Sequence, residues 1–115
     1  MTRKEIQKEI AKQFKRRLRR TYGNWRTLWD LDVVTYDSRC AVDLMSLVFR
    51  SDFTVIEIIF DNCLNTSIRI SGEPESTFCL RPFLDVCDEI RHYIAYLFAD
   101  ATMHSVLWSN IKSEK

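Results

Sequence analysis

The apolar positions near the start of the chain repeat at the spacing of an α-helix. In a helical projection of residues 3–22, the apolar side chains share one arc: Ile6, Ile10, Ala11, Phe14 and Leu18. The opposite arc is basic and holds Lys4, Lys8, Lys12, Lys15, Arg16, Arg19 and Arg20. Thr2 and Glu5 fit a capping box, and Gly23-Asn24 supplies a stop. The pattern predicts an amphipathic helix with a basic outer face.

The middle of the chain is rich in β-branched and aromatic residues and is divided by short turns. Four strands are expected, at residues 31–36, 40–50, 53–60 and 66–71. Turns are expected at 37–39, 51–52 and 61–65, and a loop at 72–76. In the fourth strand Ile68 and Ile70 alternate onto one face. Residues 77–81 fit either a short edge strand or the approach to a helix.

A second helical stripe begins after Pro82, a residue suited to a first helical position. It predicts a helix over 83–101 with Phe83, Val86, Cys87, Ile90, Ile94, Leu97, Phe98 and Ala101 on one face. The opposite face is polar and carries Asp85, Asp88, Glu89 and His92. The phase then changes, with Met103, Val106 and Leu107 on the other side. We expect a break near Thr102 and a second short helix in the tail.

This order of elements predicts one α+β domain over residues 1–115. Hairpin-length connections imply antiparallel pairing, so we expect a four-stranded antiparallel sheet between an N-terminal amphipathic helix and a C-terminal helix. Both helices are expected to pack on one face of that sheet. The length and the 46% apolar and 29% charged composition agree with a single globular domain.

The net charge of +1 conceals an uneven distribution. Residues 1–30 hold ten Lys or Arg and three Asp or Glu, a net charge of +7. Residues 31–115 hold seven basic and thirteen acidic residues, a net charge of −6. A basic start joined to an acidic body favours contact with an acidic partner, and it also allows self-association as a homodimer.

Basic and aromatic residues are interleaved at the end of the first helix. Cations neutralise phosphates and flat rings stack on unpaired bases, so this combination fits nucleic-acid contact. The candidate binding residues are Lys12, Lys15, Arg16, Arg19, Arg20, Tyr22, Trp25 and Arg26. The alternative is a solvated helix face beside core aromatics, and core packing is the favoured role of Trp25 and Trp29.

No catalytic set stands out in the sequence. A helix followed by three strands with Asp43 and Glu57 invites comparison with a small nuclease core, but Ile59 stands where that motif needs lysine. Glu57 is expected to point to the open face of the sheet. Nucleophilic catalysis requires a histidine beside a Cys or Ser, and no local signature supports one, although Cys40/His104 and Cys63/His92 pairs stay open.

Metal and cofactor sites are not expected either. Cys87 and His92 project about 140° apart on a helix, and Cys79 lacks the short spacing of zinc ligands. With only two glycines there is no phosphate-cradling loop. His92 is expected to form an exposed surface pair with Asp88, four residues earlier.

The start of the chain lacks the apolar region of a secretory signal, and no stretch is long and apolar enough to span a membrane. The four irregularly spaced cysteines fit reduced, partly buried thiols, so a cytoplasmic protein is expected. The favoured function is a small non-enzymatic interaction protein whose partner is a nucleic acid, a nucleoprotein or an acidic protein surface. The alternatives are a phage or mobile-element inhibitor of a nucleic-acid enzyme, such as a CRISPR nuclease, and a cryptic nuclease or other enzyme.

Overall fold

The computed structural model describes residues 2–37, 42–72 and 81–97. Its elements follow in the order α1 (Arg3–Tyr22), a 3₁₀ turn η1 (Trp25–Thr27), β1 (Asp30–Thr35), β2 (Asp43–Arg50), β3 (Thr54–Asp61), β4 (Thr66–Gly72) and α2 (Arg81–Leu97). The predicted α+β class and element order are confirmed. Neither helix of this described part has the length and apolar character needed to cross a membrane.

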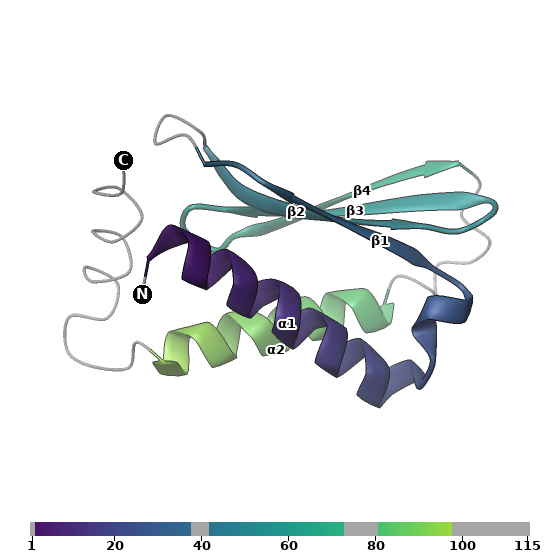
Figure 1. Ribbon diagram of the computed structural model, residues 1–115, viewed down its shortest axis with the longest axis horizontal. Helices are drawn as coiled ribbons and strands as arrows, with labels where there is room; N and C mark the ends of the chain where they lie inside the picture. The colour runs from purple at the N-terminus through teal and green to yellow at the C-terminus, as the bar shows by residue number, and fades with distance from the viewer. Residues whose placement is uncertain (1, 38–41, 73–80, 98–115) are drawn as a thin grey trace.

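The four strands form one antiparallel sheet in the order β1-β2-β3-β4, and both helices lie on the same side of it (Figure 1). Register pairs Leu47 with Ile58, and both side chains are fully buried beneath the helices. Ile58 pairs in turn with Ile68, which packs against the core from β4. On the opposite face Glu57 is half-buried and lies 3.8 Å from Arg69, as expected for the open side of the sheet.

Helix α1 begins and ends where the sequence predicts. The Thr2 hydroxyl accepts a hydrogen bond from the Glu5 backbone N–H at 3.2 Å, which satisfies one of the unpaired donors of the first turn. Gly23 ends the helix with a φ of 73°, a conformation that glycine adopts without steric cost. The predicted apolar stripe of this helix is buried throughout: Ile6, Ile10, Ala11, Phe14 and Leu18.

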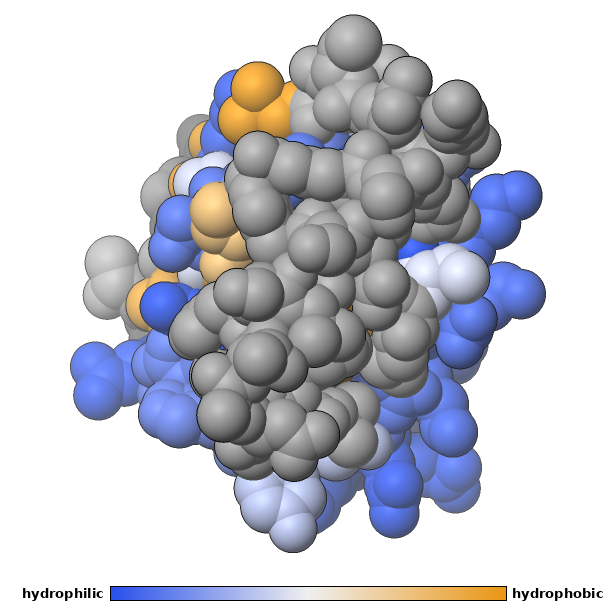
Figure 2. Space-filling model, turned by 90° about the vertical axis from the view of Figure 1, so that its left-hand side faces the viewer, coloured by the Kyte–Doolittle hydropathy of each residue, from blue (hydrophilic) through white to orange (hydrophobic). Residues whose placement is uncertain are grey.

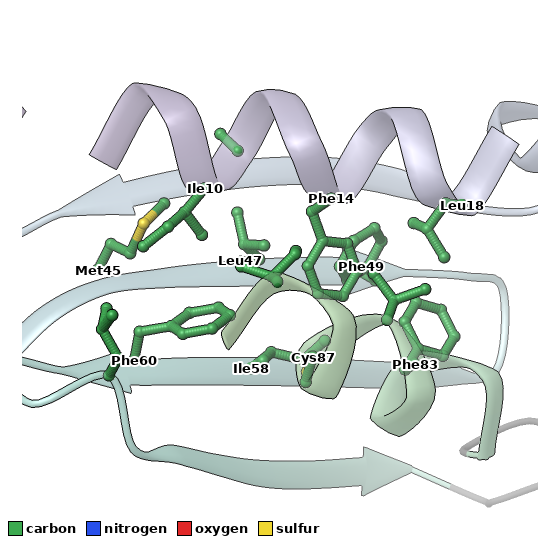
Figure 3. Close-up of a cluster of buried hydrophobic side chains, with 14 of the residues drawn as sticks. Ile10, Phe14, Leu18, Met45, Leu47, Phe49, Ile58, Phe60, Phe83 and Cys87 are labelled. Atoms are coloured by element: carbon green, nitrogen blue, oxygen red, sulfur yellow. The ribbon is translucent and has the colours of Figure 1, made fainter. Parts of the chain in front are cut away.

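The core lies between the helix pair and the sheet. Figure 3 shows Phe14 of α1 and Phe83 of α2 pointing toward Phe49 of β2. The ring centroids of Phe83 and Phe49 are 5.0 Å apart. The ring centroids of Phe14 and Phe49 are 5.5 Å apart, so Phe49 contacts both helices. Such aromatic contacts add about 0.5–1.5 kcal/mol each beyond simple burial. The core therefore fixes α1 and α2 relative to the sheet.

Helix α2 begins at Arg81, one residue before the predicted first position Pro82. The first five residues of its predicted stripe are buried, namely Phe83, Val86, Cys87, Ile90 and Ile94. The predicted extension to Ala101, the break near Thr102 and the tail helix lie outside the described residues. So do most of residues 77–81 and the first two positions of the strand expected at 40–50.

Candidate partner-binding surface

A groove runs between α1 and the edge strand β1. Its volume is about 430 Å³ and its floor is partly apolar, with Ala11 from α1 and Val33 from β1. The remaining lining residues are Lys4, Gln7, Lys8, Lys12, Lys15, Thr35 and Asp37. Four lysines against one aspartate make this groove strongly basic.

The lysines follow one side of α1 at steps of three or four residues, which places them in a row along the helix. Every ion pair found among the described residues uses an arginine as its cation, so no described carboxylate forms an ion pair with these lysines. Lys12 and Lys15 were among the predicted binding residues, whereas Lys4 and Lys8 were assigned only to the basic face. The spacing of Lys4 and Lys8 in the sequence could have placed them in the same row as Lys12 and Lys15. The groove itself could not be predicted this way, because β1 forms its other side.

Arg3 belongs to the basic start of the sequence but lies in the interior, with 2% of its surface exposed. Its Nε donates to the Tyr36 carbonyl at 2.7 Å and its Nη2 to the Asp43 carbonyl at 2.9 Å. Its Nη1 donates to Asn62 Oδ1 at 2.8 Å. The guanidinium therefore ties the start of α1 to three separate parts of the sheet, and its charge is not available to a partner.

Two further arginines of α1 face α2. Arg17 Nε lies 3.1 Å and Arg20 Nη2 2.5 Å from the same Glu89 carboxylate oxygen. The Arg17 guanidinium also stacks over the Tyr93 ring, 5.2 Å from its centroid. Arg20 was a predicted binding residue. It contacts the neighbouring helix, its side chain stays 67% exposed, and its predicted role stays a prediction.

The other predicted cations stay at the surface. Arg16 and Arg19 are exposed on α1, outside the lining of the groove. Arg26 is exposed and stacks over the Trp25 ring at 4.8 Å.

The predicted aromatic residues contribute mainly to the core. Trp25 is 4% exposed and lies 5.8 Å from the Phe49 ring, so it offers no open face for base stacking. Trp29 packs edge-on against Phe83, and Tyr22, 39% exposed, lies 6.1 Å from the same ring. Core packing, the favoured role of the two tryptophans, accounts for both.

Among the described residues weighed for enzymatic roles, Asp43 and Glu57 lie apart on the sheet. Glu57 pairs with Val48, five residues along β2 from Asp43, a separation of about 16 Å at the rise of a strand. His92 is exposed, and its Nδ1 donates to the backbone carbonyl of Asp88 at 2.7 Å. The expected His92–Asp88 contact thus involves the backbone, while the carboxylate faces Arg91.

Within the described ranges no group of three His, Cys, Asp or Glu side chains is arranged to hold a metal ion. Cys63 is exposed and Cys87 is buried, and both are free thiols. Burial is the main cause that raises the pKa of the Cys87 thiol to about 12, with the neighbouring Asp88 charge acting in the same direction. Cys40, Cys79 and His104 lie outside the described residues.

The coloured surface at the end of the molecule where α1 begins is mostly hydrophilic, with a few hydrophobic side chains among the polar ones (Figure 2). Comparison of the chain with models of protein families, with curated proteins and with solved structures finds no match. The groove and its charges are therefore the features that indicate a function.

Proposed function

We propose that this protein is a small non-enzymatic binding protein that contacts an acidic macromolecule through the lysine groove between α1 and β1. The observation that carries the proposal is that the cations of α1 differ in their contacts within the molecule. Arg3, Arg17 and Arg20 are engaged within the molecule, whereas the four groove lysines have no described acidic partner. Of the cations of α1 outside any described ion pair, the four lysines line the groove together, whereas Arg16 and Arg19 are exposed outside it.

The groove also combines charge with apolar area. Ala11 and Val33 form part of its floor, and Val33 is 40% exposed. A purely solvated helix face would need no such floor, because its cations would simply extend into water. The combination supports a partner that brings negative charge together with a surface able to cover the floor.

The proposal is tested with two defined polyanions, polyglutamate and duplex DNA, titrated at low and moderate salt. The test variant is K8E/K12E and the matched control is R69E/R81E, which changes the net charge equally at exposed positions away from the groove. We expect K8E/K12E to weaken binding of at least one polyanion by about tenfold or more, while the control stays near wild type. If duplex DNA is the ligand and four phosphates are contacted, log K should fall with log salt at about −3.6.

Two results would contradict the proposal. One is the absence of binding to either polyanion at low salt. The other is an equal loss in both variants, because binding would then follow net charge rather than the groove. Circular dichroism of both variants shows whether the fold is retained, which is expected because Lys8 and Lys12 are exposed.

The interpretation as an inhibitor of a nucleic-acid enzyme stays a prediction, since no contact among the described residues favours it.

A further inference from the structure

Strand β1 forms one edge of the sheet, and no described strand pairs with its outer side. The Tyr36 N–H donates to the Leu44 carbonyl at 3.2 Å, which shows that this residue directs its N–H toward β2. Because these groups alternate along an antiparallel strand, the N–H and C=O groups of Leu31, Val33 and Thr35 point outward. The edge therefore presents three outward-facing backbone positions.

This edge borders the lysine groove. Val33 and Thr35 line the groove from β1, and the lysines line it from α1. Val33 and Val34 are 40% and 39% exposed on the two faces of the strand. The outer edge of β1 thus carries backbone hydrogen-bonding groups and apolar side chains, and the lysines of α1 lie beside it.

We propose that the β1 edge and the lysine groove together bind an extended acidic polypeptide, which adds to the sheet as a fifth strand. The inference rests on the proposed function and names its class of partner. Strand addition supplies main-chain hydrogen bonds for affinity, and alternate side chains of the added strand supply specificity. The carboxylates of the added strand face α1.

The spacing of the lysines fits a strand. Lys4, Lys8 and Lys12 advance by about 6 Å per step along the helix axis. Every second side chain of a β-strand advances by about 6.6 Å. A segment with an acidic residue at alternate positions therefore offers one carboxylate to each lysine, and its intervening side chains fall on the open face beside Val34.

A nucleic acid fits the same surface less well. The DNA backbone carries acceptors but no donors, and the RNA backbone adds only the 2′-hydroxyl as a donor, so neither matches the regular N–H groups that an added strand offers to the outward carbonyls of Val33 and its neighbours. The Trp25 ring, which could have stacked on a base, is buried.

A second copy of this chain is opposed by charge. Antiparallel pairing of two β1 edges in one continuous sheet would place both α1 helices on the same side. Their lysine rows would then face each other, which disfavours the pairing, as charged residues beside sheet edges commonly do. The same lysines that discourage self-pairing select an acidic strand.

The test compares three labelled ligands by fluorescence anisotropy. One is a short peptide in which glutamate alternates with threonine, the second has the same residues in two blocks, and the third is a single-stranded oligonucleotide of equal charge. The alternating peptide should bind at least about tenfold more tightly than the block peptide, because only it can pair with the edge and present its carboxylates to α1 together. Hydrogen exchange should show protection of the Leu31, Val33 and Thr35 amides when it is bound.

Two variants at Val33 test the contribution of the backbone hydrogen bonds while leaving the charges of the groove unchanged. V33P removes an outward N–H that the sheet does not use, a position where an edge strand tolerates proline, and V33T is its matched control. We expect V33P to lose about tenfold in affinity for the alternating peptide, equivalent to one hydrogen bond of about 1–1.5 kcal/mol. If V33P does not fold, protection of the Leu31, Val33 and Thr35 amides in the wild-type protein decides whether the peptide adds to the sheet.

Equal affinity for the two peptides without protection of the three amides would overturn strand addition and leave the lysine groove as a simple anion site. Tighter binding of the oligonucleotide than of either peptide would do the same. The proposed function itself fails if no polyanion binds, if K8E/K12E binds as well as wild type, or if K8E/K12E and R69E/R81E lose binding equally. The two failures are therefore distinguishable.

Discussion

The buried Arg3 guanidinium provides the sharpest test of how the cations of α1 are divided between folding and binding. R3M keeps most of the side-chain volume and removes all three hydrogen bonds to Tyr36, Asp43 and Asn62. Hydrogen bonds from a charged donor contribute about 1.5–3 kcal/mol each, but the three are not independent. Gln7 Nε2 still donates to the Tyr36 carbonyl at 3.3 Å, so part of the polar surface stays satisfied.

We expect R3M to lose about 3 kcal/mol of unfolding free energy, a large share of the roughly 5–15 kcal/mol of a typical domain. At about 4–8 °C per kcal/mol for a small domain, the melting temperature should fall by roughly 12–24 °C. The assay is urea and thermal unfolding followed by circular dichroism, with an unchanged urea m-value as the sign that only stability has changed.

K4M is the matched control, because Lys4 is the next residue, carries the same charge and is exposed. It should change stability by less than about 0.5 kcal/mol yet weaken polyanion binding, since Lys4 lines the groove. A loss of less than about 0.5 kcal/mol in R3M would refute the reasoning, as would a loss in K4M of similar size. Either result would mean that the buried network does not hold α1 to the sheet.

Three further perturbations test the fold. A Cβ at Gly72 (φ 86°) would lie 2.3 Å from a carbonyl oxygen of the β2–β3 turn, so G72A should cost about 2 kcal/mol or more in urea unfolding. G23A, with similar φ and open space, should cost less, and equal losses would contradict the steric argument. Because the pKa of Cys87 is raised from 9.0 to about 12, the unfolded thiol ionises first. The protonated Cys87 thiol therefore contributes its full stabilisation of the fold below pH ~9, and this contribution falls as the pH rises toward ~12. Above pH ~9 the urea midpoint should fall more steeply with pH for wild type than for C87V. Parallel curves for the two proteins would disprove this. Asp61 Oδ1 accepts two backbone N–H bonds in the β3–β4 turn, so D61A should lower the free energy of unfolding in urea by about 1–2 kcal/mol and D61N by less. Equal losses in the two variants would assign the effect to charge.

The helices and strands could be predicted from the sequence because their signals are local. The apolar stripe of α1, its Thr2 cap and its Gly23 stop lie within the helix or beside it, and the structure confirms each. The alternation of Ile68 and Ile70 likewise identifies the inner face of β4 without reference to any partner strand. The packing of both helices on one side of the sheet was also predicted, and the structure confirms it.

The same sequence, by itself, established the uneven charge but not the use of each charge. Which cations stay free depends on contacts between distant positions: Arg3 reaches residues 33 and 59 positions away, and Arg20 reaches Glu89, 69 positions away. The groove exists only because β1 lies beside α1, which brings Val33 to the lysines. Local periodicity specifies a helix and its outer face, because backbone geometry repeats over a few residues. Only tertiary packing decides which part of that face is neutralised from within and which is left for a partner.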